Sequence, residues 1–307
     1  MIDRRIKFRH LTCFMEVARR RSVVAAAEAL SITQPAVSKT IRELEEALGV
    51  SLFDRSRRGV EITRHGEVFL RYAGAAITAL RQGVDSVAQS RAKAGIVITV
   101  GALPTVAAHV MPDAVRRYKE TGAGATVRVI TGPNNMLLGQ LRVGELDLVV
   151  GRLADAEEMH GLTFEHLHSE RIAFVVRPGH PLAGRQAVTA TEIARHTVLA
   201  PDPGSIILPI VERFLIANGC AGLPDRVETV STAFGRAYVR ANDAVWIISR
   251  GAVVNDIAEG ALVELAIDTA DTSGPVGLTI NAAVPPSPDA QLIIAAVREA
   301  AAAMPHG

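Results

Sequence analysis

The chain has 307 residues, 49% of them hydrophobic, and a formal net charge of +1 at pH 7. This length suits two or three domains, and the apolar content excludes a disordered or fibrous protein. No apolar run approaches the length of a membrane span, and the first residues, MIDRRIKFRH, lack the apolar segment of a secretion signal. We therefore expect a cytoplasmic protein without a membrane partner.

Charge is unevenly distributed along the chain. Residues 1–94 hold 17 Lys and Arg against 10 Asp and Glu, whereas residues 95–307 hold 16 against 22. A basic N-terminal third on an otherwise acidic protein favours a polyanionic partner that contacts one end only. A solvated basic surface would give the same charge balance. The sequence motifs are therefore needed to distinguish such a surface from a polyanion-binding region.

Three short amphipathic helices are predicted within the first fifty residues. In the first, FRHLTCFMEVARRRS, apolar residues recur at spacings of three and four and form one apolar face. Ser22 is placed to cap the second, VVAAAEALS. After the tight turn SIT, Thr33 is a suitable N-cap for the third helix, and Pro35 lies in its first turn, where a missing N–H costs little.

The third helix has two different faces. Val37, Ile41 and Leu44 form an apolar stripe, whereas a second face is polar and points outward. The polar face offers an amide that can bond adenine, a hydroxyl, and cations suited to guanine or phosphate, as in a major-groove recognition helix. The residues that we predict to contact DNA here are Ser31, Thr33, Gln34, Pro35, Ser38, Lys39 and Arg42. An ordinary solvated face is the alternative.

A basic hairpin is predicted after the third helix. The stretch LGVSLFDRSRRGVEITRHG contains two short β-prone runs around a basic tip. Such a wing can lay arginines on the DNA backbone or in the minor groove. We predict that its DNA contacts come from Arg55, Arg57, Arg58 and Arg64. The sequence therefore predicts a winged helix-turn-helix domain over residues 1–66.

This module resembles the signature of LysR-type transcriptional regulators. The shared stretch is AAEALSITQPAVSKTIRELEEALGVSLFDRSRRGVEITRHG, which departs from the family pattern conservatively at Ile62. The resemblance implies a DNA-binding regulator of transcription whose partners are double-stranded promoter DNA and RNA polymerase.

A long linker helix is predicted over residues 67–91. Apolar and small residues recur there in a heptad pattern, which favours a seam with a second copy of the same helix. We predict this dimer seam at Phe69, Ala73, Ala76, Leu80 and Val87. Packing on its own domain is the alternative, which the small residues also permit. The resemblance implies dimerisation through this helix and a dimer of dimers, so we expect a homodimer or homotetramer.

β-Prone runs alternate with helical stretches over residues 92–307, as in a doubly wound α/β fold with mostly parallel sheets. The predicted strands are 96–101, 125–131, 146–151, 172–178, 197–200, 227–230, 244–249 and 277–283. They are too many for one small sheet, and the family resembles periplasmic binding proteins here. We therefore expect a two-lobed effector-binding domain, with lobe I at about 95–164 and 270–307 and lobe II at about 165–269.

Ligands of such folds bind between the lobes, at strand C-termini and helix N-termini. Hydroxyls and amides at helix N-termini suit carboxylates, and Arg152 can pair with a second carboxylate. The predicted effector-binding residues are Thr105, Thr131, Asn134, Asn135, Arg152, Ser205, Ser231 and Phe234. Each also fits a helix cap or a structural turn. The stretch PDPGSI around Ser205 departs from the glycine-rich turn common in the family.

Further stretches narrow the resemblance within the family. RIKFRHL, ALRQGVDSV, VGALPTV and QLRVGELDLVVGRL are similar to those of the members that activate protocatechuate catabolism. That resemblance implies an inducer that is a carboxylated ring-cleavage intermediate of the β-ketoadipate pathway. A regulator of sugar uptake genes that answers to a neutral sugar is the alternative within the family.

An enzyme and a solute-binding protein are the alternatives from other classes. The sequence has no H-E-x-x-H, G-x-S-x-G, P-loop or G-x-G-x-x-G motif. A solute-binding protein would not need residues 8–66. We therefore expect a protein without catalytic activity, metal or cofactor.

Overall fold

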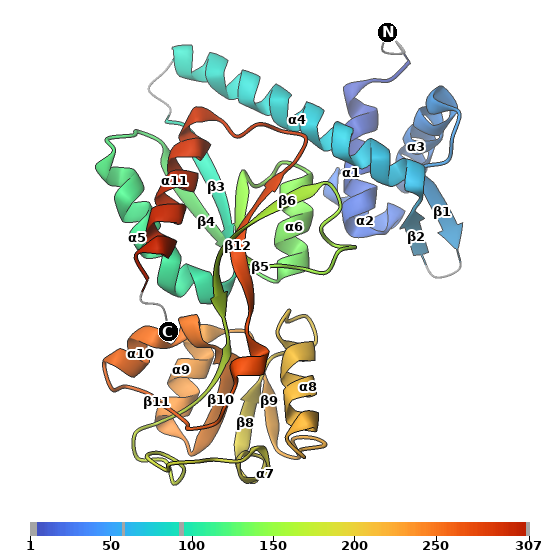
Figure 1. Ribbon diagram of the computed structural model, residues 1–307. Coiled ribbons are helices and arrows are strands. Elements are labelled where there is room, and N and C mark those ends of the chain that lie inside the picture. The colour runs from blue at the N-terminus through green and yellow to red at the C-terminus, as the bar shows by residue number, and fades with distance from the viewer. Residues whose placement is uncertain (1–4, 57–58, 92–94, 305–307) are drawn as a thin grey trace.

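The computed structural model describes residues 5–56, 59–91 and 95–304, which form three parts in chain order (Figure 1). A small helical domain with a β-hairpin comes first, and the long helix α4 (Arg64–Arg91) follows it. Two α/β lobes complete the molecule, one beyond the other. Among the described helices, none combines the length and the apolar character that crossing a membrane requires.

The N-terminal domain is a three-helix unit with a two-stranded wing. Its elements are α1 (Phe8–Arg20), α2 (Val23–Ala29), α3 (Gln34–Leu48), β1 (Phe53–Ser56) and β2 (Gly59–Ile62). The helix starts follow the sequence, because Ser22 Oγ accepts from the Ala25 N–H and Thr33 Oγ1 accepts from the Ala36 N–H. Phe14 and Ile41 are buried at the centre of the domain.

Helix α4 contacts both the N-terminal domain and lobe I. Its first half packs into the core of the N-terminal domain through Phe69 and Ala73. Further along, the helix reaches lobe I so closely that a Cβ on Gly74 would lie 2.2 Å from the backbone oxygen of Arg142. Only glycine fits this approach without a shift of the backbone.

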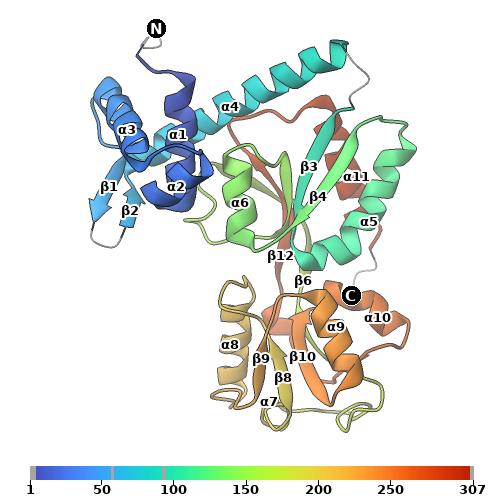
Figure 2. The ribbon, with the colours of Figure 1, turned by 180° about the vertical axis from the view of Figure 1, so that it is seen from behind.

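Lobe I is a five-stranded sheet covered on both faces. Its elements are β3 (Val97–Ala102), α5 (Pro104–Glu120), β4 (Thr126–Thr131), α6 (Asn134–Arg142), β5 (Leu148–Arg152), β6 (Leu162–Glu170), β12 (Gly274–Asn281) and α11 (Pro288–Ala302). The strand order is β4-β3-β5-β12-β6. Helices α5 and α11 pack together on one face, and α6 lies on the other (Figures 1 and 2).

Lobe II has a second five-stranded sheet, in the order β11-β7-β10-β8-β9. Its elements are β7 (Ile172–Val176), α7 (Ala190–Ile193), β8 (Thr197–Ala200), α8 (Leu208–Ala217), β9 (Arg226–Glu228), α9 (Thr232–Ala241), β10 (Ala244–Ser249), η1 (Arg250–Ala252), α10 (Val254–Ala258), β11 (Val263–Glu264) and η2 (Ala270–Thr272). Side chains alternate between two cores, because successive strand residues face opposite ways. Phe174 packs with Phe214 of α8, whereas Val175 packs with Trp246 on the opposite face.

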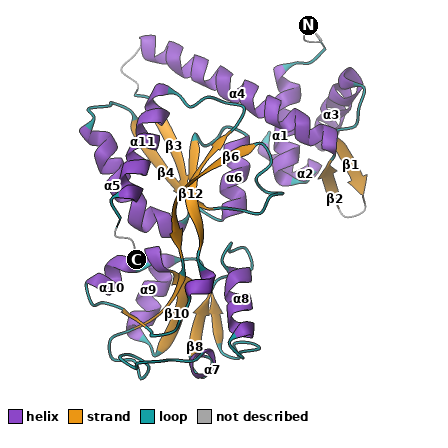
Figure 3. Ribbon diagram, in the orientation of Figure 1, coloured by secondary structure: helices purple, strands orange, loops and turns teal. Residues whose placement is uncertain are grey.

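The two-lobed α/β fold is confirmed, but the expectation of mostly parallel sheets is wrong. In each sheet two strand pairs are parallel and two are antiparallel. The reason is that the chain crosses between the lobes twice. β7, which enters lobe II, and β12, which returns to lobe I, each run opposite to the other strands of their sheet (Figure 3). β6 stays in the sheet of lobe I as far as Glu170, beyond the predicted limit of 164.

Candidate functional site

The outward face of α3 is polar and exposed. Gln34 Nε2 donates to Ser38 Oγ over 3.1 Å, which aligns an amide and a hydroxyl one helical turn apart. Lys39 Nζ lies 3.9 Å from Glu43 Oε1, and Arg42 is exposed beside them. Such a face can present hydrogen-bond donors and acceptors to base edges. Of the α3 residues that we predict to contact DNA, Ser38 is half-buried and the others are exposed, namely Gln34, Pro35, Lys39 and Arg42.

The turn before α3 uses two of the predicted contacts for its own shape. Ser31 has a φ of +54°, in the left-handed region, and is exposed. The Thr33 hydroxyl accepts from the Ala36 N–H as the N-cap, and Pro35 lies in the first turn of α3. The turn therefore fixes where α3 begins and the direction in which it runs.

The wing is an antiparallel hairpin in which Arg55 lies opposite Val60. Arg57 and Arg58, predicted at its tip, lie outside the described residues. Arg64 is exposed where α4 begins. The base of the wing is fixed by Glu45, whose Oε1 accepts from the backbone N–H groups of residues 52 and 53 at 2.7 and 3.2 Å.

The predicted dimer seam is divided between two environments. The ring of Phe69 contacts that of Phe14, and Ala73 is 2% exposed, so both belong to the N-terminal core. Ala76 is exposed and Leu80 is 52% exposed. The side chain of Val87 lies outside the described set. The heptad pattern could not separate these environments, because a helix can bury one stripe in its own domain before it presents another.

An exposed apolar stripe continues along α4 where the predicted seam leaves the core. Val68, Tyr72, Leu80 and Val84 are all exposed, and they recur at multiples of four residues. Tyr72, the most exposed at 66%, was not among the predicted seam residues. Large apolar side chains at this spacing can pack against a partner helix.

A cavity of about 360 Å³ lies between the lobes. Lobe I contributes the turns that lead into α5 and α6, together with Arg152 at the end of β5. Lobe II contributes Pro201 and residues 204–207, 229–233 and 248–249. Helices α5, α6 and α9 therefore begin at the cavity wall, and their free N–H groups create a positive potential there.

Most of the predicted effector residues line this cavity. Those in the wall are Thr105, Thr131, Asn134, Arg152, Ser205 and Ser231. Asn135 and Phe234 lie outside it: Asn135 Oδ1 accepts from the Met136 N–H, and the Phe234 ring packs against Tyr238 with the centroids 5.5 Å apart. Neighbouring residues of a helix point about 100° apart, so a position at the helix start did not guarantee a place in the wall.

The electrostatics of the cavity favour an anion. Arg152 is 6% exposed and is the one charged side chain among the described lining residues. Its Nη2 donates to the Glu170 backbone oxygen over 2.7 Å, whereas its Nη1 has no hydrogen-bond partner within the described part of the chain. The same holds for Nδ2 of the buried Asn134. Burial lowers the pKa of Arg152, against the effect of the Glu170 carboxyl. Two buried donors without partners make a ready site for carboxylate oxygens.

Sequence reasoning missed several residues of the wall. Thr229 and Thr232 flank Ser231 in the stretch TVSTAF, and Ser249 ends β10 at the same edge of the sheet as the other strand ends. The same signal, a hydroxyl at a strand end or helix start, would have found all three. Apolar wall residues such as Ile206 and Ile248 gave no such signal, because they look like ordinary core residues.

Comparison with known sequences defines the class of protein. Residues 8–67 match the family described as bacterial regulatory helix-turn-helix protein, lysR family, and residues 94–302 match the LysR substrate binding domain. This combination is that of a transcriptional regulator that carries its own ligand-binding domain. The chain belongs to the LysR family of transcriptional regulators.

One relative and two solved structures are particularly informative. The chain is 56% identical to the HTH-type transcriptional regulator PcaQ of Agrobacterium fabrum, over 98% of this chain and 97% of that one. Full-length LysG of Corynebacterium glutamicum, solved with the bound effector Arg, has a TM-score of 0.61 at 21% identity and 97% and 98% coverage. Full-length CbnR, solved with its target DNA, has a TM-score of 0.55 at 23% identity and covers 96% and 100%. The two structures share the fold of this chain.

Proposed function

We propose that this regulator activates genes of protocatechuate catabolism in response to a carboxylated ring-cleavage intermediate of the β-ketoadipate pathway. The observation that carries the proposal is the cavity between the lobes, where Arg152 and Asn134 hold donors that have no hydrogen-bond partner among the described residues. The similarity to PcaQ over nearly the whole chain supports the choice of pathway. The cavity volume suits a small metabolite of this kind.

The DNA half of the proposal rests on α3 and the wing. Gln34, Ser38 and Arg42 read base edges in the major groove of promoter DNA, and the arginines of the wing and Arg64 bind phosphates. Two subunits joined through the exposed stripe of α4 address two half-sites about one helical turn apart. Two such dimers form the tetramer.

Ligand binding is coupled to transcription through the angle between the lobes. A ligand that bonds both walls of the cavity stabilises one angle over others, in proportion to its preference for that state. In a tetramer the change alters the spacing of the DNA-binding pairs and their contact with RNA polymerase. By reciprocity, the DNA arrangement that the ligand favours binds the ligand more tightly.

Titration calorimetry on the full-length protein tests the ligand. The compounds are carboxymuconate, carboxymuconolactone, protocatechuate and galactose. We expect the carboxylated intermediates to bind and Arg152→Gln to abolish that binding, because the buried charge that pairs with them is gone. Arg195→Gln, on the exposed surface of lobe II, is the matched control. Carboxylate binding that survives Arg152→Gln unchanged contradicts the proposed site.

A neutral sugar is the second candidate, and the hydroxyl-rich wall favours it. Thr105, Thr131, Thr229 and Ser249 offer donors and acceptors that suit sugar hydroxyls as well as carboxylates. Binding of galactose alone, insensitive to Arg152→Gln, would assign the protein to the regulators of sugar uptake. The fold and the DNA-binding function would stay the same.

A further inference from the structure

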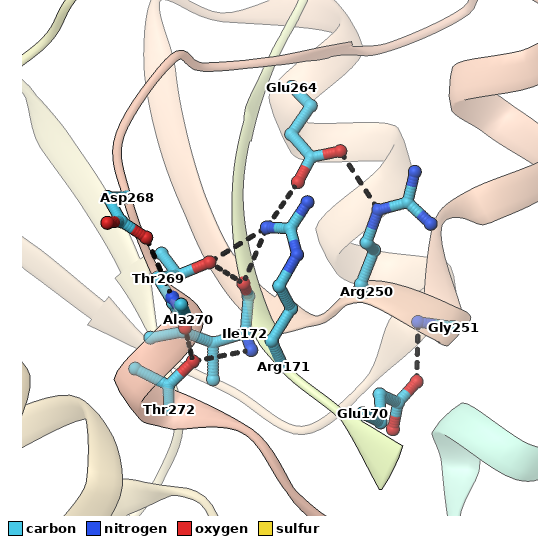
Figure 4. Close-up of polar contacts among 10 residues, drawn as sticks. All are labelled: Glu170, Arg171, Ile172, Arg250, Gly251, Glu264, Asp268, Thr269, Ala270 and Thr272. Carbon is cyan, nitrogen blue, oxygen red and sulfur yellow. Dashed lines mark hydrogen bonds and ion pairs between the residues drawn. The ribbon is translucent and has the colours of Figure 1, made fainter. Parts of the chain in front are cut away.

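Glu170 connects the ligand cavity to lobe II. It is the last residue of β6, where the chain leaves lobe I. Its backbone oxygen accepts from Nη2 of the cavity residue Arg152. Its carboxylate Oε1 accepts from the Gly251 N–H of η1 over 2.6 Å, as Figure 4 shows. Glu170 thus bonds the cavity arginine, Arg152, through its backbone and Gly251 of lobe II through its side chain.

The Glu170 carboxylate packs directly against the backbone of Gly251. A Cβ at this position would lie 2.2 Å from Glu170 Oε1 and 3.7 Å from Nδ1 of His109 in α5. Any other residue would push the carboxylate off the amide. The absence of a side chain at position 251 is therefore what lets the carboxylate reach lobe II.

The two other arginines near Glu170, Arg171 and Arg250, already have partners of their own. Arg171 Nη1 lies 2.8 Å from Glu264 Oε1 and donates to Thr269, and Arg250 Nε donates to Glu264 Oε2 over 3.0 Å (Figure 4). Arg250 still acts on Glu170 through space, but its direct partner is Glu264. Arg152, whose Nη1 has no hydrogen-bond partner in residues 5–56, 59–91 and 95–304 as described, is therefore the cation most affected by a new anion in the cavity.

The charged and titratable groups around the bond between Glu170 and Gly251 come from four elements. Arg152 of β5 and Arg250 of η1 act on the Glu170 carboxyl, His109 of α5 approaches Gly251, and His168 of β6 interacts with Arg152 and His109. Burial raises the pKa of Glu170, while Arg152, the Gly251 N–H and Arg250 lower it. Burial lowers the pKa of His168 to about 4 and also depresses that of His109. Both imidazoles are neutral near neutral pH, so Glu170 is the group best placed to gain a proton.

We propose that Glu170 is a positioning residue for Arg152, and that it takes up a proton when an anionic ligand binds this arginine. Before the ligand binds, the positive charge of the Arg152 guanidinium and the negative charge of the Glu170 carboxylate offset each other where water has little access. A ligand carboxylate adds a negative charge, and one proton from solvent on Glu170 Oε2 restores the balance. No other bond forms or breaks, and Oε1 stays available to Gly251. The inference rests on the proposed function only in taking the ligand to be an anion.

The measurement is calorimetry of the full-length protein with carboxymuconate in phosphate and in Tris, two buffers with very different ionisation enthalpies. We expect net proton uptake by the wild type, and tighter binding as the pH falls, because binding that takes up protons is favoured by protons. In Glu170→Gln the uptake and the pH dependence are lost while binding persists. A purely structural role would change affinity without changing the proton count.

The matched control is Glu165→Gln, on the same strand but exposed and paired with Arg298. We expect it to take up protons as the wild type does. Glu170→Gln with the proton uptake of the wild type overturns the inference.

A second measurement needs no ligand, so it separates this inference from the proposed function. Hydrogen exchange of the Gly251 amide reports the bond to Glu170 directly. We expect Glu170→Ala to reduce protection of this amide about tenfold, as loss of a hydrogen bond to a charged acceptor should, while Glu165→Ala leaves it unchanged. If no carboxylate binds the wild type, the proposed function fails. Equal protection of the amide in Glu170→Ala and wild type overturns the role of Glu170 whether or not a ligand binds.

Discussion

The ring of Phe69 in α4 meets the ring of Phe14 in α1 edge to face, with the centroids 5.1 Å apart and the planes at 75°. Edge-to-face pairs of this geometry are favourable beyond the area that they bury. The contact ties the first turns of α4 to the DNA-binding domain. We therefore expect the N-terminal domain to move together with the first part of α4.

Phe69→Ala should destabilise the N-terminal domain. Removal of the ring leaves a cavity beside Phe14 and Phe53, at a cost of about 2–4 kcal/mol. We expect a lower urea midpoint and loss of DNA binding. Phe69→Leu, which keeps most of the apolar volume, should recover most of the midpoint. A midpoint equal to that of the wild type would mean that the ring is not part of the core.

Leu80→Glu should weaken the dimer without unfolding the domain. The side chain is exposed on α4, so a carboxylate there disturbs only a partner that covers it. Analytical ultracentrifugation should show a shift towards monomer. Leu292→Glu, at another exposed leucine, on α11, is the control and should leave the assembly intact. An unchanged assembly in Leu80→Glu would exclude this part of α4 from the interface.

Gln34→Ala and Arg42→Ala should each weaken operator binding by about 1–3 kcal/mol, the usual value of a bidentate base contact. Fluorescence anisotropy with operator and with unrelated DNA separates specific from general affinity. Calorimetry on the same variants should give unchanged inducer binding, because α3 belongs to the N-terminal domain (Figure 1), whereas the cavity is lined by residues of the two lobes. Arg213→Ala, exposed on α8, is the control. Equal loss of DNA and inducer binding in a folded variant would contradict this division.

His168 should make stability fall as the medium becomes acidic. Its folded-state pKa of about 4 lies below the ordinary value of 6.5, so the unfolded chain binds the proton more strongly between these values. Stability is fully present above the ordinary pKa and is lost progressively as pH falls towards the folded one, by roughly 2–3 kcal/mol for this group. The urea midpoint of the wild type should fall relative to that of His168→Gln as the pH drops through this range. Parallel curves would contradict the assignment.

The positions of the strands could be predicted from the sequence, but the direction in which several side chains point could not. The eight predicted strands correspond to strands of the structure, because apolar runs between turn residues are a local signal. The stripe of α4 was ambiguous, since the same heptad positions serve the core at Phe69 and the surface at Leu80. Asn134 and Asn135 are equivalent in sequence and opposite in burial. The bond between Glu170 and Gly251 spans 81 residues and has no local signature.

The place of β12 in the sheet of lobe I has a consequence for biosynthesis. This strand lies between β5 and β6, yet it is made only after the whole of lobe II. A nascent chain that has emerged as far as about residue 265 therefore carries a nearly complete lobe II beside a lobe I that still lacks β12 and α11. Nonsense mutations late in the gene should damage the lobe encoded first. Chaperones that hold the unfinished sheet would be needed most during the synthesis of the second half of the chain.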